Sequence, residues 1–410
     1  MIVSIIILLV LVICFMKYPS KTVMVFMICY PTISLFEIGK IGIHLIFLVF
    51  VVTHLFYTKK RPLKPFPFKL SFIICFVSYT LSYLYGRTFG HYNALISPLV
   101  YFLLVYLLWC YWPLRTSENI RFFFVNLFVY LFILSLYGIY NAYTGRNEFV
   151  HYLYTLGMLD LDVGEGVRYG FYRAQSLTLW FETFAAVCGL SIGFLLMCIK
   201  QKVINSVVWV FCMIILLLFS VLITGSRSMM IMTAIISSVS LISLSANHSK
   251  VFSIIVTILV MLTYYNEELL NVIYDSIVNQ DNFSGSSTEM RTGQFLATLS
   301  YWRQSPIIGL GPGQLAELTH INGELFGGES IVFSTLVNYG LVGVFALFFL
   351  YWQIINYLIK IRMGELCIFP IGFLVGKILT MLPGMGEAYI MVYLIPLIFW
   401  GKRKIVKRIR

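Results

Sequence analysis

The stretch from residue 329 to residue 358 reads ESIVFSTLVNYGLVGVFALFFLYWQIINYL, and its only charged side chain is that of Glu329. A helix of about 20 apolar residues is long enough to cross the hydrocarbon core of a bilayer. The stretch therefore predicts a membrane-spanning helix that begins beside a carboxylate. Comparable apolar stretches recur along the chain and are separated by short polar connections.

The composition of the whole chain agrees with this interpretation. Of its 410 residues, 60% are hydrophobic and 11% are charged, whereas a typical soluble domain has roughly 25% charged residues. An ordinary soluble enzyme is therefore excluded. A transmembrane β-barrel would instead show alternating polarity in segments of about 10 residues.

We predict an all-α polytopic integral membrane protein, with residues 1–410 forming a single integral membrane domain. It should have about 13 transmembrane helices, with 12 and 14 as alternatives because the first two apolar stretches are short. Residues 1–16 lack a basic start and a small-residue cleavage site, which favours a retained span over a signal peptide. The expected spans are 2–16, 22–37, 41–57, 68–86, 93–112, 121–143, 176–199, 204–223, 228–245, 251–266, 329–358, 365–382 and 387–401.

Lysine and arginine residues in the connections indicate the orientation of the chain. If the basic residues 402–410 lie in the cytoplasm, alternate connections place 20 of the 29 basic residues on that side, but only 2 of the 17 acidic ones. Cytoplasmic loops of membrane proteins carry such an excess of positive charge. Topology therefore explains the net charge of +12, and no nucleic acid is expected as a partner.

Two long connections lie on the outer side of the predicted bundle, a smaller loop at 144–175 and a large loop at 267–328. Binding and catalytic residues concentrate in such loops, so we expect the large loop to carry active-site elements. In it, residues 269–277 predict an amphipathic helix, and residues 289–303 predict a second helix. The glycines within 309–313 predict tight turns, or a close approach of backbone to a ligand, and they lack the lysine of a P-loop.

Nine basic residues fall outside the cytoplasmic set, and seven of them are arginines. The guanidinium fork suits phosphate because it can donate two parallel hydrogen bonds. Arg227, which follows Ser226, stands at the predicted outer N-terminus of a span, where unpaired N–H groups and the helix dipole favour an anion. A second positive charge there is unfavourable unless an anion compensates it. The alternative is an arginine that reaches toward lipid headgroups.

Glu329 is the acidic residue of most interest. A charge close to an apolar helix is costly and therefore indicates function. Leu336, Gly340 and Gly343 share its helical face, where the glycines would let another helix or a lipid chain come close. The alternative is a glutamate that stabilises the start of the helix. His320 is the only histidine in the large loop, and no outer histidines have the spacing of metal ligands, so we expect no metal and no other cofactor.

Taken in order, these features resemble the superfamily of O-antigen polymerases and O-antigen ligases. They are the segment TGSR at 224–227, a large outer loop with Arg291, Trp302 and SPIIGLGPG at 305–313, and the segment YGLVG at 339–343. The resemblance covers roughly residues 165–345. In the ligase branch a His-Asn pair usually stands eleven residues before the first glycine of the last segment. Here Glu329 and Ser330 stand there, so the chain looks more like the polymerase (Wzy-type) branch.

The resemblance implies a fold similar to the GT-C-type membrane glycosyltransferases, and a metal-independent enzyme of the bacterial inner membrane. The large loops would be periplasmic and the C-terminus cytoplasmic. Donor and acceptor would be undecaprenyl-diphosphate-linked glycans embedded among membrane lipids, and a polysaccharide chain-length regulator would be a further partner. The expected activity is the joining of oligosaccharide repeat units during lipopolysaccharide or related polysaccharide biosynthesis.

Such a reaction needs cations for the leaving diphosphate and a base for the attacking hydroxyl. We therefore predict that Glu329 is the catalytic base, and that Arg227 and Arg291 bind the diphosphate. Further substrate contacts are expected from Arg173, Arg303, Arg168, His320 and Ser226.

Three other functions remain open. An O-antigen ligase would use the same donor but transfer the glycan to a lipid A core. A peptidoglycan polymerase also handles lipid diphosphates, although no matching motif is present. A polysaccharide flippase or transporter would favour ionisable residues deep within the spans and two related halves, and the sequence shows no internal repeat.

Overall fold

The computed structural model describes residues 2–38, 41–58, 66–86, 92–111, 116–157, 167–168, 171–204, 207–245, 288–321, 330–380 and 387–409. Most of these residues are helical. Two short antiparallel strand pairs are also present, with two residues in each strand. They are β1 (Glu37–Ile38) with β2 (Ile41–Gly42), and β3 (Val167–Arg168) with β4 (Phe171–Tyr172).

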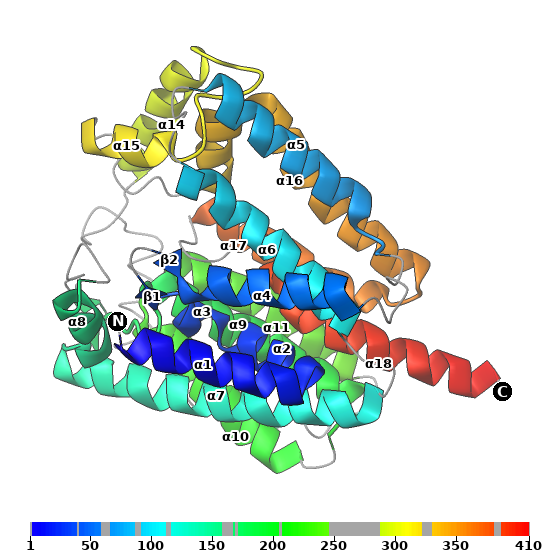
Figure 1. The fold of residues 1–410 in the computed structure, drawn as a ribbon. Coiled ribbons are helices and arrows are strands. Elements are labelled where there is room, and N and C mark those ends of the chain that lie inside the picture. The colour runs from blue at the N-terminus through cyan, green and yellow to red at the C-terminus, as the bar shows by residue number, and fades with distance from the viewer. Residues whose placement is uncertain are drawn as a thin grey trace. The chain divides into compact units, whose positions relative to one another are not determined.

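The described elements group into two compact units, whose helices are drawn in Figure 1. The first unit comprises Met1–Phe66, Val100–Ser237 and Pro383–Arg410, and the second comprises Pro67–Leu99 and Ser238–Leu382. Helices α6 (Tyr92–Tyr111) and α11 (Arg227–Ser245) run across unit boundaries. The other helices of the first unit are α1 (Ile2–Lys17), α2 (Pro19–Ile28), α3 (Tyr30–Ile33), α4 (Ile43–Thr58), α7 (Thr116–Thr144), α8 (Glu148–Thr155), α9 (Phe181–Lys200), α10 (Val207–Ile223), η4 (Glu387–Ile390) and α18 (Met391–Ile409). Those of the second unit are α5 (Lys69–Tyr85), α14 (Thr288–Trp302), α15 (Gln314–Ile321), α16 (Ile331–Lys360), η3 (Gly364–Cys367) and α17 (Ile368–Leu379).

Four of the described helices are long and apolar enough to cross a membrane. They are Glu118–Thr144, Phe181–Lys200, Arg227–Leu244 and Ile331–Lys360, and several shorter apolar helices accompany them. These helices support the predicted class, an all-α membrane protein. The count of about 13 spans stays a prediction. The span expected at 251–266 and the amphipathic helix expected at 269–277 lie outside the described residues.

Helix α9 forms the centre of the first unit. Every residue from Thr183 to Ile199 is buried, although a helix with lipid on one side would keep an exposed face. It packs against α10 and α18. Gly189 permits a close approach of α11, because a Cβ there would lie 2.3 Å from Oγ1 of Thr233. Small residues allow helices to pack closely inside membranes.

Two expected spans differ from the helices observed. The span predicted at 176–199 begins as a helix only at Phe181, because Ser176 adopts a φ of 56° and Thr178 Oγ1 bonds the carbonyls of Gln175 and Trp180. Hydroxyl side chains that bond nearby backbone compete with the helix in this way. The span predicted at 22–37 is divided between α2 and α3, since Pro31 cannot supply the N–H that would continue α2.

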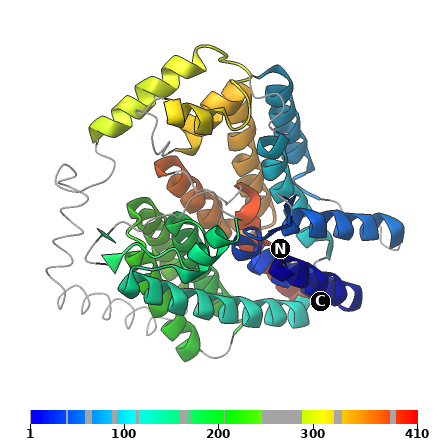
Figure 2. The same ribbon diagram turned by 60° about the vertical axis from the view of Figure 1, so that its left-hand side comes forward.

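The second unit is organised around the paired helices α5 and α16, which run side by side in Figures 1 and 2. The rings of Tyr79 and Tyr339 lie 4.3 Å apart. Near the other end of the pair, the side-chain amide of Gln353 accepts from the backbone N–H of Ser71 at 3.1 Å and donates to the carbonyl of Pro67 at 3.1 Å. Helices α14 and α15 lie at the end of the pair where α16 begins (Figure 1).

Helix α16 is interrupted at Gly340, whose φ of 61° and ψ of −159° are not helical. The preceding loop supplies the hydrogen bonds that the interruption removes. Before the break, the carbonyls of residues 337 and 338 accept from Leu310 N at 2.7 Å and Gly311 N at 3.1 Å. After the break, Leu341 N donates to the carbonyl of residue 306 at 3.0 Å, and Val342 N to that of residue 307 at 3.1 Å. The loop thus satisfies backbone groups on both sides of the break, which apolar surroundings would otherwise leave unpaired.

Glycine is required where the loop and the broken helix touch. A Cβ on Gly340 would lie 2.4 Å from the carbonyl oxygen of Ile307, and a Cβ on Gly309, whose φ is 75°, would lie 2.5 Å from that of Asn338. The glycines in the segment 309–313 were expected to form tight turns or to admit a ligand. Gly309, Gly311 and Gly313 all have positive φ values, as tight turns require, and Gly309 also lets one backbone approach another.

We predict that Gly340→Ala disrupts this junction. The backbone region of Gly340 is essentially restricted to glycine, and a side chain there costs roughly 1–3 kcal/mol, before the clash with Ile307 is counted. The purified variant should unfold in detergent at a lower temperature than the unmodified protein.

Gly364→Ala is the matched control, since nothing lies within 4 Å of a Cβ built at Gly364 in η3. It should change the unfolding temperature little. Equal unfolding temperatures for the Gly340 variant and this control would contradict the proposed role of the junction.

Candidate functional site

The turn between α10 and α11 presents Arg227 at the first position of α11, as the sequence predicted. Gly225 has a φ of 63°, which reverses the chain there. Thr224 Oγ1 donates to the carbonyl of Val221 at 2.6 Å and accepts from Ser226 N at 3.3 Å. Ser226 is buried, and Arg227 is half-buried. Local hydrogen bonds therefore fix the conformation of the turn that precedes Arg227.

Arg173 lies against the same turn. Its Nε donates to the carbonyl oxygen of Thr224 at 3.2 Å, and its guanidinium carbon lies 3.2 Å from the centre of the Phe181 ring. The neighbouring Ala174 N donates to the carbonyl of Ile223 at 3.2 Å. A guanidinium stacked on a ring and bonded to a backbone oxygen is restricted in its orientation. Arg173, 54 residues before Arg227 in the sequence, thus lies against the turn that leads into the helix start at Arg227.

The segment that carries Arg173 is itself anchored. The ring of Phe171 in β4 packs against Tyr143 at 5.6 Å and Phe219 at 6.2 Å. Arg168 pairs with Phe171 in the short hairpin, and its side chain lies outside the described residues. The hairpin connects directly to Arg173, so packing on α7 and α10 holds this arginine near the turn.

A buried polar network also holds residues 175 and 176, which follow Arg173 in the chain. Asn147 Nδ2 donates to Gln175 Oε1 at 3.3 Å and to the carbonyl of Ser176 at 2.9 Å. Ser176 Oγ donates to the carbonyl of Leu134 in α7. The residues predicted from the sequence did not include Asn147, Gln175 or Ser176. Their position at the ends of the smaller outer loop was the available signal, because buried polar groups must find partners.

The helices α9 and α11 begin with side chains of opposite charge. Glu182 directly follows Phe181, on which Arg173 stacks, and lies in the first turn of α9. A carboxylate is favourable at a helix N-terminus. Arg227, by contrast, places a positive charge at the N-terminus of α11, where the helix dipole is also positive. A positively charged helix start beside a second guanidinium has the chemistry of an anion site.

The remaining predicted residues belong to the second unit. Arg291 lies in the first turn of α14, Arg303 directly follows that helix and is exposed, and His320 lies near the end of α15. The side chains of Arg291 and His320 are outside the described residues, as is the whole of Glu329. The described part of the chain begins again at Ser330, whose Oγ caps α16 by accepting from Val332 N at 3.2 Å.

Helix α14 carries two buried polar residues that were not predicted from the sequence. Gln294 and Thr298 follow Arg291 by three and seven positions, so all three residues lie on one helical face. Gln294 is 1% exposed and Thr298 is fully buried. The helical spacing was visible in the sequence, but their burial was not, because α14 has a weak apolar pattern.

Asn338 joins the elements around the break in α16. Its side-chain oxygen accepts from Leu315 N in α15 at 2.9 Å, and its backbone carbonyl accepts from Ser82 Oγ in α5. Helix α14 is attached to α16 by the rings of Phe295 and Phe333, which lie 5.8 Å apart. The helices that carry Arg291 and His320 are therefore both fixed to the first part of α16.

The structure thus brings together Arg173, Ser226 and Arg227 in the first unit, and carries Arg291, Arg303 and His320 on connected elements of the second unit. Within the ranges that the structure describes, no group of three or more His, Cys, Asp or Glu residues could hold a metal ion.

Comparison with known proteins addresses the same part of the chain. No curated protein matches the sequence. Residues 212–349 match the family described as O-antigen ligase. The matching segment begins in α10, includes Arg227, Arg291 and Glu329, and ends in α16 beyond the break at Gly340. The match supports a relationship to the superfamily of O-antigen ligases and polymerases, whose members are membrane enzymes of the glycosyltransferase and ligase type, and it does not distinguish between these two activities.

Proposed function

We propose that the chain is a membrane glycosyltransferase that polymerises undecaprenyl-diphosphate-linked repeat units into O-antigen or a related surface polysaccharide. The reaction would occur at the periplasmic face of the bacterial inner membrane. The observation that carries the proposal is the contact of Arg173 with the turn at Thr224, which leads into the N-terminus of α11 at Arg227. Arg227 lies within the segment that matches the family.

This arrangement suits a diphosphate. The N-terminus of α11 offers backbone N–H groups and the positive end of a helix dipole. Arg227 adds a guanidinium at the same place, and Arg173 adds a second one that Phe181 and Thr224 hold in position. Each fork can donate two hydrogen bonds to phosphate oxygens. Arg173, which the sequence suggested only as a further contact, is therefore proposed as a principal ligand together with Arg227.

The proposed reaction is the transfer of a glycan from the donor to a hydroxyl of the acceptor. A hydroxyl oxygen of the acceptor repeat attacks the anomeric carbon of the donor, and Glu329 takes the hydroxyl proton. The bond between that carbon and the diphosphate oxygen breaks, and the lipid diphosphate leaves with the electron pair. Arg227, Arg173 and Arg291 are proposed to stabilise the charge that grows on the leaving group. Arg168, Arg303, His320 and Ser226 are proposed to contact the substrate.

One sequence feature favours polymerase over ligase. Eleven residues before Gly340 the chain has Glu329 and Ser330 rather than the His-Asn pair that is usual in ligases. The ligase remains the second candidate, because the family match carries that description. The two activities differ in acceptor, since a polymerase extends a lipid-linked repeat and a ligase transfers to a lipid A core. A chain-length regulator is a proposed partner of the polymerase.

We predict that Arg227→Ala abolishes chain growth. Removing one preorganised donor to a charged transition state typically lowers the rate by roughly 10²–10³-fold. The purified protein would be given a lipid-linked repeat in detergent, and the products would be separated by length. Arg227→Lys should restore only part of the rate, because an ammonium group lacks the planar fork. A lysine variant with full activity would contradict recognition by the guanidinium.

We predict a similar loss for Arg173→Lys, although the charge is retained. Lysine cannot reproduce both the stacking on Phe181 and the hydrogen bond from Nε to Thr224, so the charge would no longer be held at the turn. The rate should fall about tenfold or more. Arg146→Lys is the control, since Arg146 is exposed in the same outer loop. Equal rates for the two lysine variants would exclude Arg173 from the site.

We predict that Glu329→Gln leaves single repeats as the main product. The loss of a general base lowers a rate by roughly 10²–10⁴-fold, while the amide preserves the size of the side chain. Glu365→Gln, in η3 at the predicted cytoplasmic side, is the matched control and should make full-length polymer. Full-length polymer from the Glu329 variant would show that another residue is the base. Transfer to a lipid A core without polymerisation would identify a ligase.

A further inference from the structure

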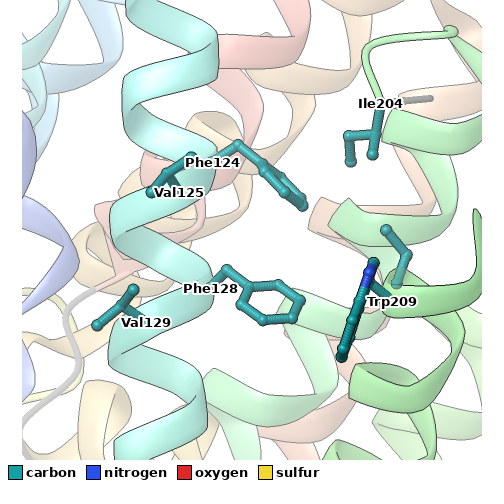
Figure 3. A pocket seen from close by; sticks show the side chains of 7 residues that line it. Phe124, Val125, Phe128, Val129, Ile204 and Trp209 are labelled. Atoms are coloured by element: carbon teal, nitrogen blue, oxygen red, sulfur yellow. The ribbon is translucent and has the colours of Figure 1, made fainter. Parts of the chain in front are cut away.

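An apolar groove with a volume of about 260 Å³ lies between α7 and the start of α10 in the first unit. Figure 3 shows Phe124 and Phe128 of α7 pointing across it toward Ile204 and Trp209. The rings of Phe124 and Phe128 lie 6.0 Å apart and form one wall. No polar surface lines the groove. Its volume is below the roughly 300–1,000 Å³ of drug-sized pockets, and suits one hydrocarbon chain.

The surface around this groove is open. Trp209 is 69% exposed and Val208 is 72% exposed, whereas Val210 on the groove floor is buried. Large exposed apolar side chains of this kind face lipid in a membrane protein. Tryptophan is also enriched where the hydrocarbon core meets the polar headgroups. The groove therefore opens toward the bilayer, near one of its surfaces.

Positively charged residues lie beside one end of the groove, where Phe124 and Ile204 are. Arg121 precedes Phe124 by three positions and Val125 by four, so it lies on the same face of α7 one turn away, and it is exposed. Lys202, also exposed, precedes Ile204 by two positions. The nearby carboxylate of Glu118 lies 3.8 Å from the ammonium of Lys21, which offsets its charge.

The turn that carries Lys202 has a defined conformation. Lys202 has a φ of 53°, and its N–H donates to the carbonyl of Ile199 at 2.9 Å, which ends α9. The indole N–H of Trp400 in α18 donates to the carbonyl of Gln201 at 3.2 Å. These bonds hold the backbone at the cationic end of the groove, so that end is a fixed feature of the fold.

We propose that this groove holds one acyl chain of an anionic phospholipid, whose phosphate is bound by Arg121 and Lys202. The apolar lining fits the chain, and the two cations fit the headgroup. A second copy of the protein fits less well, because helices that associate in membranes do so through small residues, whereas large aromatic side chains line this groove. The proposal does not depend on the glycosyltransferase activity, and the site is separate from the turn at Arg227.

The test is native mass spectrometry of the full chain in mild detergent, first as purified and then after delipidation and addition of phosphatidylglycerol or phosphatidylcholine. We expect one phospholipid to remain bound, with at least about fivefold preference for phosphatidylglycerol. Arg121→Gln combined with Lys202→Gln should remove that preference. Phe128→Ala combined with Trp209→Ala should reduce the binding of both lipids, as should Ile204→Trp, which fills the groove.

Trp352→Ala is the control, because Trp352 is 57% exposed on α16 and does not line the groove. This variant should bind lipid as the unmodified protein does. The unfolding temperature of each variant verifies that it is folded. Lipid binding that is the same in all variants would overturn the proposal. So would equal binding of the two lipids by the unmodified protein, retention of a polyprenyl phosphate instead, or a dimer that the groove substitutions dissociate.

Discussion

The hydrogen bonds between the loop at 306–311 and the broken helix α16 hold the second unit in its observed form. A transmembrane helix normally satisfies its own backbone, and an interruption leaves carbonyls on one side and N–H groups on the other without partners. Here one loop provides donors and acceptors at the correct spacing for both sides. The arrangement needs glycine at positions 309 and 340, where the two backbones are too close for a Cβ. Asn338 then connects the same point to α5 and α15.

Parts of this fold could be predicted from sequence because they depend on local properties. The long apolar stretches gave the class of the protein and the approximate bounds of α16, and the helical pattern at 289–303 gave those of α14. The segment TGSR placed Arg227 at the start of α11, since a turn and a helix start have local signatures. The break in α16 could not be predicted in the same way. Gly340 and Gly343 stand at a spacing typical of helix packing, and only the contact with residues 306–311 shows that Gly340 interrupts the helix.

The candidate site shows the same division between local and distant information. The arginines outside the predicted cytoplasmic loops suggested an anionic ligand, but no sequence pattern made Arg173 a stronger candidate ligand than Arg303. In the structure, Arg173 is distinguished by its contacts with Phe181 and Thr224, which lie 8 and 51 positions away. Similarly, Asn147 and Ser176 are ordinary loop residues until the fold brings them together. A site built from several helices depends on contacts between distant segments, and single-chain patterns carry little information about such contacts.

The hydrogen bonds between the loop and the broken helix α16 also constrain how the protein is inserted into the membrane during translation. Residues 306–311 leave the ribosome before residues 337–342, with which they form their hydrogen bonds. Until translation reaches Val342, the amides of Leu310 and Gly311 and the carbonyl of Ile307 cannot form their hydrogen bonds to α16, so the loop cannot enter hydrocarbon alone. Insertion of α16 and closure of the loop must therefore occur together, which makes this junction a late and cooperative step in the biogenesis of the second unit.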